Sequence, residues 1–169
     1  MTARFRTRDL AALVGALLLA GCAGSTPRAA TPAPGTPVAL SVDALPDIDG
    51  KSHALLADDK PTVLIFWATW CPPCIAKLPR LAQIEEELGD RAHFYGILAG
   101  SEKQVNPMQV RAHTGRASIR YPQLRDRAGA LVGDFSIEAT PTIIVLGPDG
   151  TIRYRDKDLP ASWETLLAR

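Results

Sequence analysis

A short apolar run followed by two cysteines limits the possible folds of this chain more than any other feature. Residues 62–67 are apolar apart from one threonine and rich in β-branched and aromatic side chains, which is typical of a strand buried on both faces. From Pro73 onward, apolar residues recur at helical spacing as far as Leu88, and Gly89 stands where a helix commonly ends. The sequence therefore predicts that residues 70–74, Trp-Cys-Pro-Pro-Cys, lie where a buried strand passes into a helix.

Cys71 and Cys74 have the C-x-x-C spacing of redox-active pairs. Disulfide exchange needs a thiolate, and the free N–H groups and positive dipole end of a helix N-terminus favour that anion. Cys71 is therefore predicted to be the exposed catalytic nucleophile. Cys74, one turn further on, is predicted to resolve the mixed disulfide, so that Cys71–Cys74 is the redox-active disulfide.

The alternative for this pair is a zinc or copper site. The chain has no second cysteine pair and no histidine close to this one in sequence, so we predict no metal site. No cofactor is predicted either.

Pro72 and Pro73, between the cysteines, are predicted to tune the active site. Neither has an N–H, so fewer donors can point at the Cys71 sulfur. We expect Cys71 to be acidified only modestly, and the protein to be a reductant rather than a strong oxidant.

Residues 1–21 have the pattern of an export signal. Arginines precede an apolar run from Leu10 to Ala20, which is about 11 residues long and shorter than the ~20 residues that span a bilayer. The run ends in Leu-Ala-Gly-Cys22, which resembles a bacterial lipobox. That resemblance implies a lipoprotein signal peptide, with Cys22 lipidated and the protein anchored on the extracytoplasmic face of a membrane, periplasmic in a Gram-negative cell. A plain secretory signal with a chance Cys22 is the alternative.

The rest of the chain divides into a tether and one domain. Residues 22–37 are almost all Ala, Gly, Ser, Thr and Pro, which is typical of a semi-extended tether. The apolar pattern resumes at Val38, which predicts a domain over 38–169, large enough for its own core. The net charge is +1 and no basic block occurs, so no nucleic-acid partner is predicted. We expect a monomer.

Beyond the cysteines, strand and helix patterns alternate. This alternation predicts an α/β fold with a central mixed β-sheet flanked by helices and an N-terminal β-hairpin extension. The expected strands are 38–42, 52–56, 62–67, 93–98, 142–146 and 151–154, with a hairpin turn at Asp49-Gly50. The expected helices are 73–88, 101–113 opened by a capping box at Ser101–Gln104, 129–135 and 161–168.

These features resemble the thioredoxin superfamily. The resemblance is carried by residues 66–74 (FWATWCPPC), by Pro79, and by Thr140-Pro141-Thr142 before a strand. The export signal, the extra hairpin and the segment inserted before Pro141 are similar to the extracytoplasmic TlpA/ResA-like branch. The resemblance covers about residues 38–169 and implies a thioredoxin-like fold.

The resemblance also implies the surroundings of the cysteines. Pro141 is expected to be a cis proline beside them, with the Thr140 backbone pairing with an extended substrate segment. A proline that merely begins the strand at Thr142 is the alternative. Trp70 is expected to flank the site and bind substrate, the alternative being a packing role.

By the same resemblance, the protein is an enzyme, a membrane-anchored thiol–disulfide oxidoreductase. It is expected to reduce disulfides in exported proteins, such as apocytochrome c during cytochrome c biogenesis or copper-site cysteines, and to be recharged by a membrane thiol carrier. The alternatives are a disulfide oxidase or isomerase, and a metal-binding module on a thioredoxin scaffold.

Two positions depart from the family pattern. Ile65 stands where thioredoxins have a buried aspartate, and Lys77 where many TlpA/ResA-like proteins have a glutamate. The resemblance therefore does not identify the group that deprotonates Cys74. Lys77 is either a cation that reaches back over the helix start or a solvated helix residue, and Glu138 is either close to the site or an exposed loop carboxylate.

Overall fold

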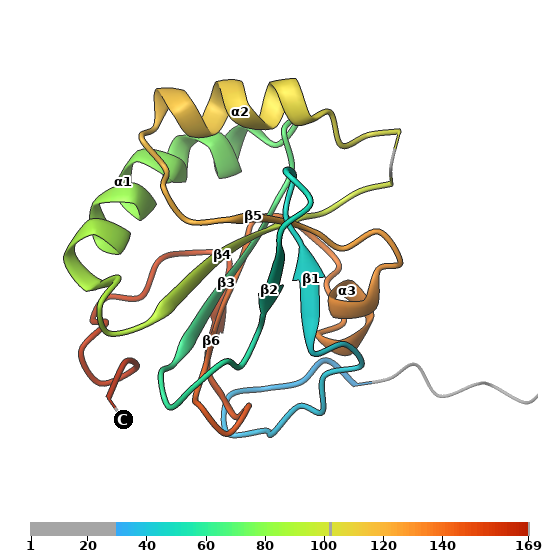
Figure 1. Cartoon of the computed structure of the whole chain (residues 1–169). Helices are drawn as coiled ribbons and strands as arrows, with labels where there is room; N and C mark the ends of the chain where they lie inside the picture. The colour runs from blue at the N-terminus through green and yellow to red at the C-terminus, as the bar shows by residue number, and fades with distance from the viewer. Residues whose placement is uncertain (1–29, 102, 169) are drawn as a thin grey trace, which may run out of the picture.

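The run predicted as a buried strand is β3 (Thr62–Trp67), the central strand of a five-stranded sheet in the computed structural model (Figure 1). The structure describes residues 30–101 and 103–168, so the predicted signal peptide and Cys22 lie outside it. The other strands of this sheet are β4 (His93–Leu98), β5 (Gln123–Arg125), β6 (Thr142–Leu146) and β7 (Ile152–Asp156). The remaining elements are the hairpin strands β1 (Ala44–Pro46) and β2 (Ser52–Ala54) and the helices α1 (Pro72–Leu88), α2 (Pro107–Arg116) and α3 (Ala130–Asp134).

The sheet order is β5-β4-β3-β6-β7. The β5, β4 and β3 strands run parallel to one another, whereas β6 is antiparallel to both β3 and β7. The predicted α/β fold with a mixed sheet and an N-terminal hairpin is confirmed. Within the described residues, no helix combines the length and apolarity needed to cross a membrane.

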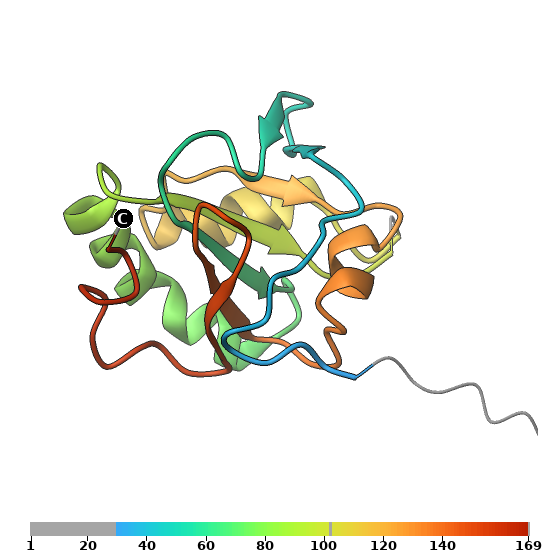
Figure 2. The ribbon, with the colours of Figure 1, turned by 90° about the horizontal axis from the view of Figure 1, so that it is seen from below.

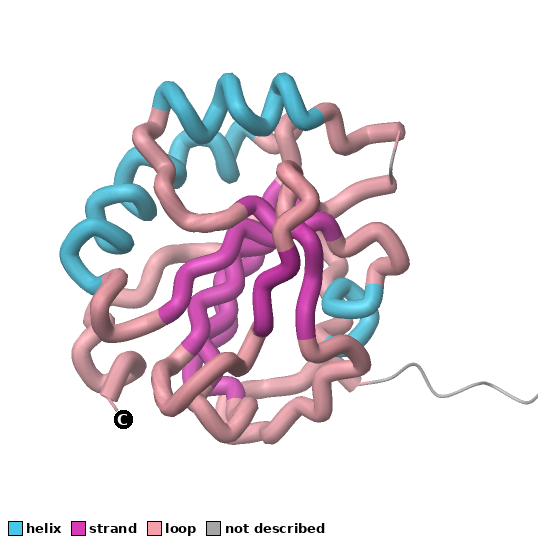
Figure 3. The backbone as a smooth tube through the Cα atoms, viewed as in Figure 1, coloured by secondary structure: helices cyan, strands magenta, loops and turns pink. Residues whose placement is uncertain are grey.

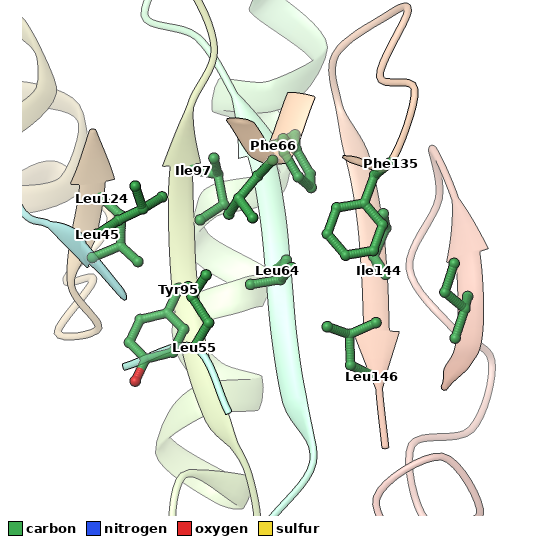
Figure 4. Packing of buried hydrophobic residues seen from close by; sticks show 12 residues of the cluster. Leu45, Leu55, Leu64, Phe66, Tyr95, Ile97, Leu124, Phe135, Ile144 and Leu146 are labelled. Atoms are coloured by element: carbon green, nitrogen blue, oxygen red, sulfur yellow. The ribbon is translucent and has the colours of Figure 1, made fainter. Parts of the chain in front are cut away.

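The side chains of β3 alternate between two cores, one on each face of the sheet. Val63 and Ile65 belong to the core that includes α1 and the C-terminal segment. Leu64 and Phe66 belong to the core under the hairpin and α3, where the Phe66 and Phe135 ring centroids are 6.1 Å apart (Figure 4). Figure 2 shows α1 and the hairpin on opposite sides of the sheet. Because both faces of β3 are buried, a one-residue slip would move every one of its side chains into the wrong core.

A third, smaller cluster lies where β3 ends and α1 begins. It contains both cysteines, Trp67 of β3, Leu78 of α1 and Val110 of α2. The Trp67 Nε1–H donates to Gln123 Oε1 on β5 at 2.9 Å, in a buried environment. Gly96 on β4 leaves room for that amide, since a Cβ at Gly96 would collide with the Gln123 side chain. Trp67, Leu78 and Val110 thus pack around the two cysteines in this cluster.

The first strand was expected at 38–42, and this expectation is wrong. The hairpin strand is β1, because its turn is closed by Asp47, whose Oδ1 accepts from the N–H groups of Asp49 (2.8 Å) and Lys51 (3.0 Å). Residues 38–42 instead begin beside the turn between β6 and β7, where the Val38 N–H donates to the Gly150 carbonyl at 3.2 Å. Just before them, residues 35–37 are held against β7 by backbone hydrogen bonds.

The helix expected over 101–113 begins later, at Pro107. Asn106 is its N-cap, and the Asn106 Oδ1 accepts from the Met108 N–H at 2.9 Å. Because proline disfavours helical backbone at the preceding residue, Asn106 is extended and the helix cannot begin at Ser101. The Ser101 and Gln104 side chains do bond to each other at 3.0 Å, as in a capping box, but they close an isolated turn.

The C-terminal segment 161–168 was expected to be a helix and is a loop with one turn (Figure 3). Its turn has one helical hydrogen bond, from the Leu167 N–H to the Trp163 carbonyl at 2.9 Å, and both of these side chains are buried against the sheet. The Arg153 guanidinium donates a hydrogen bond to the Leu166 carbonyl oxygen at 3.0 Å. Burial of the Trp163 and Leu167 side chains against the sheet holds this segment in its loop conformation.

Replacing Gln123 with Met is expected to lower the free energy of unfolding by about 1–3 kcal/mol, because the buried Trp67 N–H loses its acceptor. The matched control is Gln83→Met on the exposed face of α1, which should change that free energy by less than about 0.5 kcal/mol. Urea unfolding of both oxidised variants measures the difference. Equal stability of the two variants would contradict this role for Gln123.

Candidate active site

The two cysteines form a disulfide at the start of α1. Their sulfurs are 2.04 Å apart and their Cα atoms 5.3 Å apart. Cys71 is the N-cap of α1 and has extended backbone, so its side chain lies over the open end of the helix. Cys74 lies in the first turn and packs into the small cluster beneath. The predicted position, between a buried strand and a helix, is confirmed.

Cys71 is buried, with 4% of its surface exposed, and the expectation of an exposed nucleophile is wrong for this disulfide state. Its sulfur is bonded to Cys74 and lies 3.5 Å from the Thr140 carbonyl oxygen. Cys74 is buried too, at 2% exposed. The backbone at Thr140 therefore covers the side of Cys71 that α1 leaves open.

Pro72 and Pro73 are the first two residues of α1, and both are exposed. Because neither has an N–H, Cys74 is the first helical residue that can donate, and its N–H lies 3.3 Å from the Cys71 sulfur. An N-cap side chain ordinarily accepts from the second or third helical N–H. The prolines thus reduce the number of N–H donors in the first turn near that sulfur, and their role in tuning the pKa of Cys71 stays a prediction.

The Thr140–Pro141 peptide bond is cis, as the resemblance implies. Pro141 is buried and precedes β6, which pairs with β3 through Thr142 and Phe66. This pairing places the start of β6 next to the end of β3. Thr140 is therefore next to Cys71 although 69 positions separate them.

A groove of about 410 Å³ leads away from the cysteines along α1. It is lined by Pro73, Lys77, Ala139, Thr140, Pro141, Lys157 and Asp158. We call it the cis-proline groove. One wall is the first part of α1, and the rest is formed by the segment just before β6 and the residues that follow β7.

Lys77 fits neither of its two expected roles. Its Nζ lies 2.9 Å from Asp158 Oδ1, and its side chain is only 26% exposed. Hydrogen bonding to this ammonium holds the pKa of the Asp158 carboxyl below its usual range. Lys77 is thus a paired residue in the wall of the cis-proline groove. The sequence contains no signal for Asp158, which lies 81 positions away.

Trp70 lies on the rim of the site and is 61% exposed, which excludes core packing as its role. The preceding residue, Thr69, donates from its hydroxyl to Gln109 Oε1 of α2 at 3.3 Å. Met108, beside Gln109, is 76% exposed. Trp70 and Met108 are the two large hydrophobic side chains that the described part of the chain leaves exposed.

Two further positions considered from the sequence are Ile65 and Glu138. Ile65 is buried in the core under α1, so no carboxylate stands where thioredoxins have one. Glu138 is exposed in the loop before Thr140.

The three histidines do not form a metal site. His53 pairs with an aspartate at 2.7 Å and His93 with another at 3.0 Å, whereas the His113 ring lies edge-on to Trp67. Within residues 30–101 and 103–168, nowhere do three or more His, Cys, Asp or Glu side chains gather as a metal would require.

Comparison with known proteins agrees with this geometry. The AhpC/TSA family profile matches residues 42–155. Thioredoxin-like protein YneN of Bacillus subtilis is 31% identical over 104 residues, which cover 61% of this chain and 59% of YneN. Thiol-disulfide oxidoreductase ResA of Bacillus cereus is 23% identical over 63% of this chain and 60% of ResA. The matches thus span about 60% of the length of these two relatives.

A solved structure confirms the fold. The crystal structure of a secreted Mycobacterium tuberculosis disulfide oxidoreductase, homologous to E. coli DsbE, superposes with a TM-score of 0.58. The superposition covers 70% of this chain and 84% of that one, at 22% identity. The predicted thioredoxin-like fold and the resemblance to ResA-like proteins are confirmed.

Replacing Pro73 with Ala is expected to lower the pKa of the Cys71 thiol by about 1–2 units. The change restores an N–H at the second helical position, and a hydrogen bond to an ionised group contributes ~1.5–3 kcal/mol. Because a more stable thiolate favours the reduced form, the reduction potential should rise. Thiolate absorbance during a pH titration of the reduced protein measures the pKa. Pro79→Ala, which alters the same helix further on, should leave it unchanged, and equal values in all three proteins would contradict the donor argument.

Proposed function

This chain belongs to the AhpC/TSA family, and we propose that it acts as a thiol–disulfide oxidoreductase of the thioredoxin-like type. One observation carries the proposal. The Cys71–Cys74 disulfide closes the start of α1, with the backbone of Thr140 3.5 Å from the Cys71 sulfur. A reactive pair and an adjacent segment for binding substrate backbone are what disulfide exchange with a protein requires.

In the proposed reaction, Cys71 is the nucleophile and Cys74 the resolving cysteine. The Cys71 thiolate attacks one sulfur of a substrate disulfide, which forms a mixed disulfide and releases the other substrate sulfur as a thiolate. The Cys74 thiolate then attacks the Cys71 sulfur, which releases the second substrate thiolate and restores the Cys71–Cys74 bond. Two electrons pass to the substrate, and the two protons of the dithiol are transferred with them. The position of Cys71 supports this assignment, since Cys71 is the N-cap beside Thr140, whereas Cys74 lies one turn into α1.

Trp70 and the Thr140–Pro141 segment are proposed to hold the substrate. The exposed indole of Trp70 offers apolar surface on one side of the disulfide. On the other side, the Thr140 backbone leads into the cis-proline groove. An extended substrate segment between them would bring its own disulfide to Cys71.

The direction of exchange is proposed to be reduction. The prolines that follow Cys71 leave the N–H of Cys74, at the third helical position, as the first that can donate to its thiolate, so the reduced form is not strongly stabilised. Disulfides of exported proteins, such as those of apocytochrome c or copper-site cysteines, are the proposed substrates. A membrane thiol carrier is proposed to return electrons to the Cys71–Cys74 pair.

A Cys74→Ser variant is expected to accumulate mixed disulfides with exported proteins through Cys71, because the resolving thiolate is missing. Non-reducing electrophoresis followed by mass spectrometry identifies the trapped proteins. The matched control, Cys71→Ser, should trap far less. Equal trapping by both variants would contradict the assignment of Cys71 as the nucleophile.

The protein is further proposed to be held outside the cytoplasm by lipid on Cys22. The lipobox pattern and the short apolar run support this placement. Replacing Cys22 with Ser is expected to move the protein from the membrane fraction to the soluble extracytoplasmic fraction. Fractionation after expression in a bacterial host measures this, and retention of the Ser variant in the membrane fraction would contradict lipid anchoring.

A further inference from the structure

We propose that the cis-proline groove selects substrates by charge, binding an acidic side chain close to the substrate cysteine. The inference rests on the proposed function and names the class of segment that the site accepts. It concerns the two lysines in the groove walls, Lys77 and Lys157.

The groove lies next to the reactive disulfide, and Thr140 connects the two. Thr140, whose carbonyl oxygen is 3.5 Å from the Cys71 sulfur, is also part of the groove lining. Pro73 and Lys77 stand one helical turn apart on the α1 wall. A substrate segment whose disulfide has reached Cys71 therefore extends past the Lys77 ammonium.

Positive charge is in excess in the lining. It has two lysines and one aspartate, and Lys77 and Asp158 pair at 2.9 Å. Lys157 is exposed and makes no hydrogen bond or salt bridge with any residue of the described part of the chain, although its positive charge helps to lower the pKa of the nearby Asp158 carboxyl. Its ammonium is thus available to a carboxylate that enters the groove.

The Lys77–Asp158 pair can also exchange partners. The Asp158 side chain is 63% exposed, and ion pairs this close to water contribute little to stability. A substrate carboxylate can share the Lys77 ammonium at low cost. Lys77 and Lys157 thus both favour a negative charge on the substrate.

The spacing sets where the acidic residue should stand. Lys77 lies six residues beyond Cys71, roughly 9 Å along the helix at ~1.5 Å per residue. An extended chain advances ~3.3 Å per residue, so this distance corresponds to about three substrate residues. The groove therefore favours Glu or Asp about three positions from the substrate cysteine.

The test uses two disulfide-bonded peptides that differ only in Glu or Lys at the third residue from the cysteine. The fully reduced protein should reduce the Glu peptide about five- to tenfold faster than the Lys peptide. Lys157→Gln should decrease this ratio about two- to fivefold, the range expected for one exposed ion pair. Added salt should also decrease the ratio in the wild type, because exposed charges are screened.

Lys51→Gln, on the hairpin turn, is the matched control and should keep the wild-type ratio. Equal rates for the two peptides, or an unchanged ratio in Lys157→Gln, would overturn the charge selection while leaving the oxidoreductase proposal intact. A wild-type protein that reduces neither peptide would overturn the proposed function, and the inference with it.

Discussion

Burial of β3 on both faces is the constraint on which the rest of this structure depends. Its side chains alternate between two cores, so packing on both faces determines its register and where it ends. A shift in register would remove side chains from both cores at once. Trp67, the last residue of β3, is held by Gln123 in the buried interior. The cysteines follow within seven residues, and their position is therefore as well determined as that of the core.

The same strand brings the second half of the site into place. Since β6 is the antiparallel neighbour of β3, the segment before β6 must lie at the end of β3 where α1 begins. That pairing puts Thr140 beside Cys71 and opens the cis-proline groove between α1 and the residues after β7. The disulfide, the Thr140 backbone and the cis-proline groove thus meet because the strands next to them, β3, β6 and β7, belong to one sheet.

Prediction from sequence succeeded where local pattern and burial agree. The strands β3, β4 and β6 and the helix α1 were predicted closely, because long apolar runs and helical spacing decide them. It was wrong where a single polar side chain or proline ends an element. Asp47 determines where the hairpin strands lie, and Pro107 delays the start of α2.

The sequence by itself determined the reactive chemistry: two cysteines at a strand-to-helix junction, with prolines that remove donors from the first turn. Only the tertiary structure decided what surrounds them. The burial of Cys71, the pairing of Lys77 with Asp158 and the positive charge of the groove depend on side chains from segments far apart in the chain. Local pattern reports the conformation of a segment, whereas contacts between segments are determined by how the sheet aligns them.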